Sequence, residues 1–308
     1  FTNRTRPDFS SRVITQKIGY NWKNSKNLQH QLNLIELSFS DIGEINSFIE
    51  NELIENPYLR EQFEDKFISA TNYVFSFNNQ KIYKPINHTY IKGKAEFSGN
   101  LLSAIAPMLS FKQNEKDQYV IFNNSFSQYV RIDLDVRRYI ILTKDNTVVL
   151  RGFCGVGYSY DNSEELPIQK QFFSGGVNSI RAWEAFGLGP GSSTDLNNYS
   201  TGDIKLEFNI EYRLPLYNSL KSAFFIDGGN IWSIKNDPRE GSRFKLNSFA
   251  SEIAIGIGMG FRYDFDFFVI RIDMATPLRD PILTPNERWI KNPLSGNFRY
   301  NLAIGYPF

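Results

Sequence analysis

Apolar and polar residues alternate with a period of two through the last third of the chain. Between residues 204 and 216 every second residue is apolar, and charged or amide residues lie between them up to Arg213. Successive side chains of a strand point to opposite faces of a sheet, so this pattern predicts a strand with one apolar and one polar face. The pattern recurs at residues 253–263, 268–275 and 298–308. These rows predict strands of roughly 8–13 residues, the length that a tilted strand needs to cross a bilayer.

The predicted strands upstream are less regular, but their apolar and polar residues also alternate. We expect them near residues 12–22, 29–39, 67–78, 88–99, 126–142 and 147–160, with a further strand at 222–232. The predicted total is about eleven strands. A single such strand also suits a soluble sandwich, in which the apolar face is buried against a second sheet.

Composition favours a membrane barrel over a sandwich. Mean hydropathy is −0.36, but 15% of residues are aromatic and 27 are Phe. Apolar runs such as residues 253–261 are far shorter than the roughly 18–20 residues of a membrane helix. In a transmembrane β-barrel half of each strand faces lipid and half faces water, which reconciles the polar average with the aromatic content. We therefore expect an all-β, antiparallel transmembrane β-barrel.

Other function classes find little support. The 34 Lys and Arg residues against 33 Asp and Glu argue against a nucleic-acid partner. One Cys and two His, His30 and His88, argue against a disulfide framework or a metal site, and no cofactor is implied. The glycines between 256 and 260 fall within a strand, so they form no dinucleotide loop. Neither His has a plausible Ser or Cys partner, so we expect no enzyme.

The connections alternate between short and long. Short links lie near residues 23–27, 79–87, 144–146, 217–219 and 264–266, and long links near 41–65, 101–118, 161–201, 234–247 and 277–296. Short periplasmic turns and long extracellular loops are typical of barrels in the outer membrane of Gram-negative bacteria. Because such barrels normally have an even strand number, and because the chain starts at Phe1 without Met, we expect strands to be missing on the N-terminal side. We find no second-domain boundary and treat residues 1–308 as one barrel domain.

The longest connection, residues 161–201, carries a distinctive motif. Its members are Gly175, Gly176, Ser179, Ile180, Arg181, Ala182, Trp183, Gly189, Pro190 and Gly191. This segment resembles the sixth extracellular loop of the BamA/TamA superfamily of outer-membrane assembly factors, the bacterial surface-antigen family. There a Val-Arg-Gly-Phe/Tyr-like tetrad follows a Gly-Gly-x-x-Ser lead. Ala182 at the Gly position of the tetrad is a departure that puts the close backbone approach there in doubt.

Downstream segments extend the resemblance. Glu211 resembles an inward acid of the strand after the loop, and Asp227 matches a Phe-x-Asp-x-Gly pattern in the next one. A Pro-Leu-Arg-Asp segment at 277–280 and five strands after the loop also agree. The resemblance implies the last eleven or so strands of a sixteen-stranded barrel, with periplasmic POTRA modules before Phe1. The Leu-Gly-Pro-Gly variant of the loop resembles the TamA-like branch (TamL) of Bacteroidota.

The charge of Arg181 supports a role for the loop. A loop of about 40 residues is usually functional or disordered, and Arg181 lies in an apolar, glycine-rich stretch, so it needs an anion if it folds inward. Glu211 and Asp227 are expected to face the lumen, where a guanidinium and carboxylates form a directional, charge-assisted clamp. We predict that the loop docks in the lumen through Arg181. The alternative is a solvated loop with an ordinary surface Arg.

The last strand is a second candidate. Its row of Tyr300, Leu302, Ile304, Tyr306 and Phe308 resembles the signal by which barrel proteins are recognised for insertion, although any last barrel strand has similar residues. In the family, the seam between first and last strands opens and pairs with an incoming strand. Interior glycines Gly256, Gly258, Gly260 and Gly305 either soften the wall near that seam or make room for the docked loop.

The resemblance implies a non-enzymatic factor that inserts or translocates outer-membrane proteins. Its partners would be the lipid bilayer, unfolded outer-membrane protein substrates and periplasmic or lipoprotein subunits. Two alternatives stay open: a transport pore of the two-partner secretion type, which shares the tetrad loop, and a passive porin or surface adhesin. A soluble enzyme ranks last.

Overall fold

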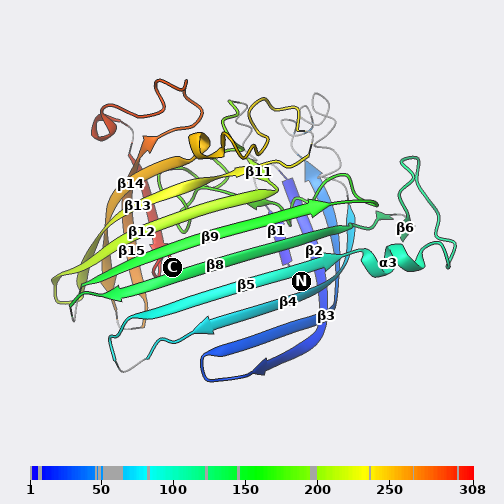
Figure 1. Ribbon diagram of the computed structural model, residues 1–308, viewed down its shortest axis with the longest axis horizontal. Coiled ribbons are helices and arrows are strands. Elements are labelled where there is room, and N and C mark those ends of the chain that lie inside the picture. The colour runs from blue at the N-terminus through cyan, green and yellow to red at the C-terminus, as the bar shows by residue number, and fades with distance from the viewer. Residues whose placement is uncertain are drawn as a thin grey trace. The chain divides into compact units, whose positions relative to one another are not determined.

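The computed structural model describes residues 2–5, 9–45, 47, 50, 65–81, 84–121, 124–143, 146–194, 200–235, 237–265, 267–296 and 298–308. Within these residues the regular secondary structure is almost entirely strand (Figure 1). The strands of the main sheet are β1 (Thr2–Thr5), β2 (Phe9–Lys23), β3 (Leu28–Ile45), β4 (Lys66–Asn78), β5 (His88–Ser98), β8 (Tyr129–Ile141), β9 (Thr147–Ser159), β12 (Ile204–Tyr217), β13 (Leu220–Trp232), β14 (Ala254–Asp264), β15 (Val269–Arg279) and β16 (Arg299–Ile304).

The connections carry a few small elements. Two short strand pairs form there, β6 (Val120–Ile121) with β7 (Asn124–Ser125) and β10 (Phe172–Phe173) with β11 (Thr201–Gly202). Short helices are α3 (Asn100–Ile105), η2 (Phe249–Glu252) and η3 (Pro293–Ser295). No helix among the residues described here is long and apolar enough to cross a membrane.

The strand order follows the chain. It reads β1-β2-β3-β4-β5-β8-β9-β12-β13-β14-β15-β16, so each long strand pairs with the next long strand. The registered pairs β2–β3, β12–β13, β13–β14, β14–β15 and β15–β16 are antiparallel. The eleven strands predicted from alternation are all present, and β1 is an additional one.

The chain divides into two compact units. The first comprises residues 1–76, 93–133 and 156–171, and the second comprises residues 77–92, 134–155 and 172–308. The tetrad loop from Phe172 onward and the strands β12 to β16 all belong to the second unit.

In the second unit, polarity is reversed relative to a water-soluble protein. On β12, Ile210 is 43% exposed, whereas the neighbouring Asn209 and Glu211 are 1% and 0% exposed. Phe208, Tyr212 and Leu216 of the same row are exposed too, so no second sheet within the described residues covers them. An apolar exposed face and a buried polar face are what lipid contact outside and polar contacts inside require. The exposure pattern agrees with the prediction, made from the sequence, that the apolar rows face lipid.

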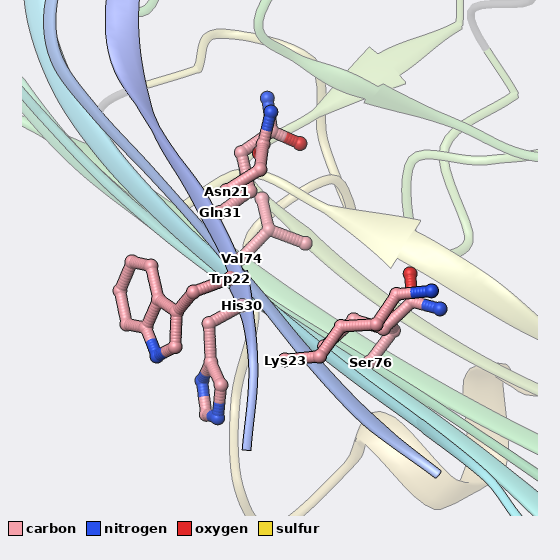
Figure 2. Close-up of a pocket in the computed structure, with 8 residues that line it drawn as sticks. Asn21, Trp22, Lys23, His30, Gln31, Val74 and Ser76 are labelled. Atoms are coloured by element: carbon pink, nitrogen blue, oxygen red, sulfur yellow. The ribbon is translucent and has the colours of Figure 1, made fainter. Parts of the chain in front are cut away.

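The first unit also has an exposed apolar face and a buried polar face. On β3, Asn33 and Glu36 are buried while Leu37 is exposed. Figure 2 shows Trp22 and His30 pointing to one side of the hairpin of β2 and β3, and Asn21 and Gln31 pointing to the other.

The aromatic side chains of this hairpin stack at the strand end. The rings of Trp22 and His30 lie 5.1 Å apart, and His30 Nδ1 lies 2.6 Å from the Tyr73 hydroxyl. A hollow of about 200 Å³ beside them is lined partly by Lys23 and Ser76. Trp and Tyr at this level are typical of the interfacial girdle of a membrane protein.

The last strand ends earlier than the sequence pattern predicts. β16 stops at Ile304, and Gly305 adopts a φ of +86°. After this turn Tyr306 lies 4.4 Å from the Arg213 guanidinium, and Phe308 is buried. Tyr300, Leu302 and Ile304 stay on the exposed apolar face as expected. The backbone turn therefore moves the final two aromatic residues of the row to the polar side.

Candidate functional site

Arg181 is the centre of the site. It lies in the connection between β9 and β12 and is fully buried. Its Nε and Nη2 donate to the two carboxylate oxygens of Asp227 at 2.8 and 2.9 Å, and its Nη1 donates to Glu211 at 2.6 Å. The Arg181 backbone N–H also donates to Asp227, at 3.1 Å. The structure thus brings together the three residues that the sequence analysis grouped, in a bidentate arrangement with Asp227.

Further charged residues complete this group. Asp273 of β15 lies 3.4 Å from Arg181 Nη1, and Arg262 of β14 contacts both Asp273, at 2.9 Å, and Glu211, at 3.2 Å. Arg213 pairs with Glu211 at 2.7 Å, and Arg271 pairs with Asp273 at 3.1 Å. We call these residues the clamp cluster. Its members are Arg181, Arg213, Arg262, Arg271, Glu211, Asp227 and Asp273.

Sequence reasoning missed four members of the cluster, Asp273, Arg213, Arg262 and Arg271. Each lies in a polar row of the sequence, but alternation shows only which face of the sheet a residue is on. The register between strands determines which residues lie side by side, and it places Asp273 opposite Gly260 on β14. Gly260 leaves this space open, because a Cβ built there would lie 2.0 Å from the Asp273 carboxylate.

The apolar residues of the tetrad pack beside the cluster. Ile180, Ala182 and Trp183 are buried in one cluster with the ring of Phe225. That ring also lies 3.3 Å from the Arg181 guanidinium carbon, so it covers one face of the cation. The loop therefore buries both an ion pair and an apolar patch on the polar face of the sheet.

Ala182 has a complementary residue on β14. A Cβ built on Gly256 would lie 2.6 Å from the Ala182 methyl. The side chain that departs from the family pattern is therefore accommodated by a glycine opposite it. Of the two roles considered for the interior glycines, Gly256 makes room for the loop, and Gly258 makes room for Phe225, whose ring would lie 2.4 Å from a Cβ there. Gly305 has open space around it instead.

The loop backbone requires its glycines at two points. Gly175 has a φ of +88°, and a Cβ there would lie 1.9 Å from the Glu184 carbonyl oxygen. Gly189 has a φ of +80° and would clash with Asn230 at 2.4 Å. The backbone of Gly176 is held by a bond from its N–H to the Trp183 carbonyl, at 2.8 Å.

The Gly-Pro-Gly segment is held by the end of β13. The N–H of Gly191 donates to the Ile231 carbonyl at 2.8 Å, and its carbonyl accepts from Asn230 Nδ2 at 2.7 Å. The peptide bond between Gly189 and Pro190 is cis. This second attachment lies within the same unit as the clamp cluster.

Ser179 makes a third attachment. Its hydroxyl donates to Glu207 at 2.7 Å, and its carbonyl accepts from Asn209 Nδ2 at 3.0 Å. Glu207 is in turn paired with Lys205 and Arg151, at 2.7 and 2.5 Å. The Ser of the lead sequence is thus bonded directly to β12.

The edge strand also contacts the loop. Asn301 Nδ2 of β16 donates to the Arg181 carbonyl at 3.0 Å, and Arg299 forms an ion pair with Glu184. Tyr300, Leu302 and Ile304 alternate with these residues on the opposite, exposed face. β16 therefore presents one face to the loop and the other to the surroundings.

In the first unit, the upstream part of the connection has its own ion pair. Lys170 Nζ lies 2.6 Å from Glu96 of β5, which is also paired with Lys94. The Tyr129 hydroxyl donates to the same carboxylate at 2.6 Å. The sequence analysis did not identify this group.

The carboxyl group of Asp203, outside the strands, has a raised pKa. Burial raises the pKa of Asp203 to about 6, although the Ile234 N–H donates to its carboxylate at 2.9 Å. Asp203 lies between β11 and β12, at the end of the loop. In the part of the chain that the structure covers, no group of three or more His, Cys, Asp or Glu side chains could hold a metal ion.

Comparisons with known proteins agree with this architecture. The Omp85 superfamily domain matches residues 5–292. The outer membrane protein assembly factor BamA of Neisseria meningitidis serogroup B is 27% identical over 101 residues, which cover 30% of this chain and 13% of that protein. The crystal structure of BamA from Haemophilus ducreyi lacking POTRA domains 1–3 matches with a TM-score of 0.66 and 11% identity.

These matches differ in what they establish. The Haemophilus structure covers 96% of this chain, and this chain covers 55% of it, so the likeness shows a shared fold over part of a longer protein. The match to the superfamily domain extends over both units described above.

Proposed function

The chain belongs to the Omp85 superfamily, whose members are β-barrel proteins of the Gram-negative outer membrane, and we propose that it acts in the insertion or translocation of other outer-membrane proteins. Its substrates would be unfolded outer-membrane proteins, and the lipid bilayer and periplasmic or lipoprotein subunits its other partners. The proposed mechanism has two parts, a loop docked in the lumen through Arg181 and a seam at the edge strand β16.

The main support for this proposal is the complete burial of Arg181 among carboxylates of neighbouring strands. An unpaired buried charge is very costly, so the loop is stable in this position only while Glu211 and Asp227 are opposite it. Ordering the part of this long connection that the structure describes also costs conformational entropy, which a plain connector has no reason to bear. The arrangement therefore favours a loop whose docked position is part of the activity.

The second part concerns the edge of the sheet. β16 is the last strand in the order and pairs with only six residues of β15, Ile270–Ala275. An edge strand offers unpaired N–H and C=O groups to which an incoming strand can add. No covalent step is needed, because the work is an exchange of backbone hydrogen bonds beside the bilayer.

The experiment measures insertion of an unfolded barrel substrate into liposomes that contain the intact protein. Arg181→Ala and Asp227→Ala should each lose most of the insertion rate, because each removes one side of the same ion pair. Arg138→Ala is the control, since Arg138 is an exposed arginine of β8 that is bonded to the Thr89 hydroxyl and lies outside the clamp cluster. Wild-type rates in both clamp variants would refute the docking mechanism.

The alternatives give other results. A two-partner secretion pore would release a soluble substrate across the liposome membrane rather than insert one. A passive porin would show a large and constant single-channel conductance without substrate. Either result, with no insertion by the wild-type protein, would overturn the assembly proposal.

A further inference from the structure

The segment after β5 exposes an apolar surface that belongs to neither the clamp cluster nor the strands. It consists of α3 and the turn that follows, and we call residues 100–111 the α3 segment. Leu101, Met108 and Leu109 are 71%, 82% and 62% exposed, and α3 has no buried residue. Large apolar side chains this exposed and this close in sequence mark an interaction surface rather than ordinary surface variation.

The sequence around the segment carries no charge. From Phe97 to Phe111 there is no Lys, Arg, Asp or Glu, and Lys112 is the first charged residue afterwards. A docking surface for a protein partner usually has a polar, charged rim, whereas an uncharged apolar surface suits the acyl-chain boundary of a bilayer. Charge therefore favours lipid as the occupant.

The position of the α3 segment also favours lipid as the occupant. Phe97, at the end of β5, is exposed, whereas its neighbours Glu96 and Ser98 are fully buried, so Phe97 lies on the lipid-facing side. Figure 1 shows α3 directly beyond the end of β5. The apolar face of the strand thus continues directly into the α3 segment.

Two tyrosines fix the start of the segment at the level of the interface. The Tyr160 hydroxyl donates to Asn100 Oδ1 at 2.7 Å. The rings of Tyr158 and Tyr160 stack with centroids 6.4 Å apart, and Tyr158 is exposed beside them. Tyr residues at strand ends are typical of the headgroup level of a membrane. The segment therefore begins where lipid headgroups meet acyl chains.

We propose that the α3 segment is an interfacial membrane anchor, with Leu101, Met108 and Leu109 inserted among lipid acyl chains at the long-loop end of the sheet. Such segments bury their apolar face about 5–10 Å into the headgroup and acyl boundary. The anchor would hold this loop against the bilayer, and it is independent of the Arg181 clamp.

The test places an NBD fluorophore on single cysteines of the intact protein, reconstituted in vesicles of phosphatidylcholine and phosphatidylglycerol. The native Cys154, exposed on the apolar face of β9, provides the lipid-contact reference. Met108→Cys and Glu115→Cys are made in a Cys154→Ser background. Glu115 is the matched control, because it is exposed in the same connection but lies in its charged part.

Brominated phosphatidylcholine quenches fluorophores that touch its acyl chains. The label at position 108 should be quenched to a similar degree as the label on Cys154, and more strongly by shallow than by deep bromines. The label at position 115 should not be quenched. Both substituted side chains are exposed, so folding is not at risk.

Two outcomes would overturn the proposal. The first is a label at position 108 that is as insensitive to brominated lipid as the label at position 115. The second is shielding that disappears when the protein is diluted with excess lipid, which would assign the surface to a second copy of the chain.

Discussion

The asymmetry within the clamp cluster leads to a quantitative prediction. Asp227 accepts both parallel bonds of the Arg181 guanidinium, whereas Glu211 accepts one and is also paired with Arg213 and Arg262. When Arg181 is removed, the negative charge of Asp227 is therefore less well compensated than that of Glu211, which keeps two arginine partners. We expect Arg181→Ala to be coupled strongly to Asp227→Asn and weakly to Glu211→Gln.

The size of the expected coupling energy follows from the hydrogen bonds that each carboxylate retains when Arg181 is removed. Without the guanidinium, Asp227 retains the backbone N–H of residue 181 and the amide of Asn209, at 3.1 and 2.9 Å. Breaking a buried ion pair from one side costs about 3–5 kcal/mol. We expect a coupling energy of about 2–3 kcal/mol with Asp227→Asn, and about 1 kcal/mol or less with Glu211→Gln. The single Arg181→Ala change should shift the docking equilibrium by about two to four orders of magnitude.

Hydrogen exchange of the loop measures this equilibrium without a label. The amides of Gly176 and Trp183 are bonded to carbonyls within the loop, so their exchange reports loop opening. Mass spectrometry of peptides from residues 174–186 would be compared for the single and double variants. Peptides of β3, in the other unit, are the control and should keep wild-type exchange.

One result would refute the reasoning. If the Arg181→Ala and Asp227→Asn double variant loses the sum of the two single losses, the guanidinium and the carboxylate act independently. Equal coupling to Glu211→Gln and Asp227→Asn would equally contradict the asymmetry.

Three further predictions test other contacts. Because the pKa of Asp203 is raised to about 6, the folded protein holds this proton more tightly than the unfolded chain, so stability should fall by up to about 3 kcal/mol as pH rises from about 4 to 7. Urea unfolding at several pH values should show this slope in the wild type and a flatter one in Asp203→Asn. Gly256→Ala should reduce loop protection by about 1–3 kcal/mol through overpacking against Ala182, and Ala182→Gly should restore it in the double variant; failure of the rescue would contradict the contact. Lys170→Met should destabilise the first unit by about 1–3 kcal/mol, because Glu96 loses a buried partner, and unchanged unfolding would contradict that.

The strands were largely predictable from sequence. Each long strand separates lipid-facing from polar residues, so the period of two marks it regardless of its neighbours. β1 was missed because the four residues from Thr2 to Thr5 contain no apolar residue and so have no alternation to detect. The path after Ile304 was missed because the positive φ of Gly305 turns the backbone, so that Tyr306 and Phe308 lie on the polar side of the sheet. Alternation of apolar and polar residues does not reveal such a turn.

The site was predictable only in part. The family resemblance grouped Arg181 with Glu211 and Asp227, and the structure brings these three into contact. Asp273 and the surrounding arginines depend on the register between strands, which no single strand reveals. The fit of Ala182 against Gly256 likewise joins residues that lie far apart in the sequence.

Full burial of the Arg181 guanidinium has a consequence for ionic strength. Mobile ions screen charges that face water, with a Debye length of about 8 Å at physiological salt, but they reach a buried pair poorly. The exposed contact between Arg299 and Glu184 should therefore weaken in concentrated salt, whereas the pair of Arg181 and Asp227 should not. Release of this loop thus requires a competing hydrogen-bond donor or a shift of the strands themselves, and not a change in the surrounding electrolyte.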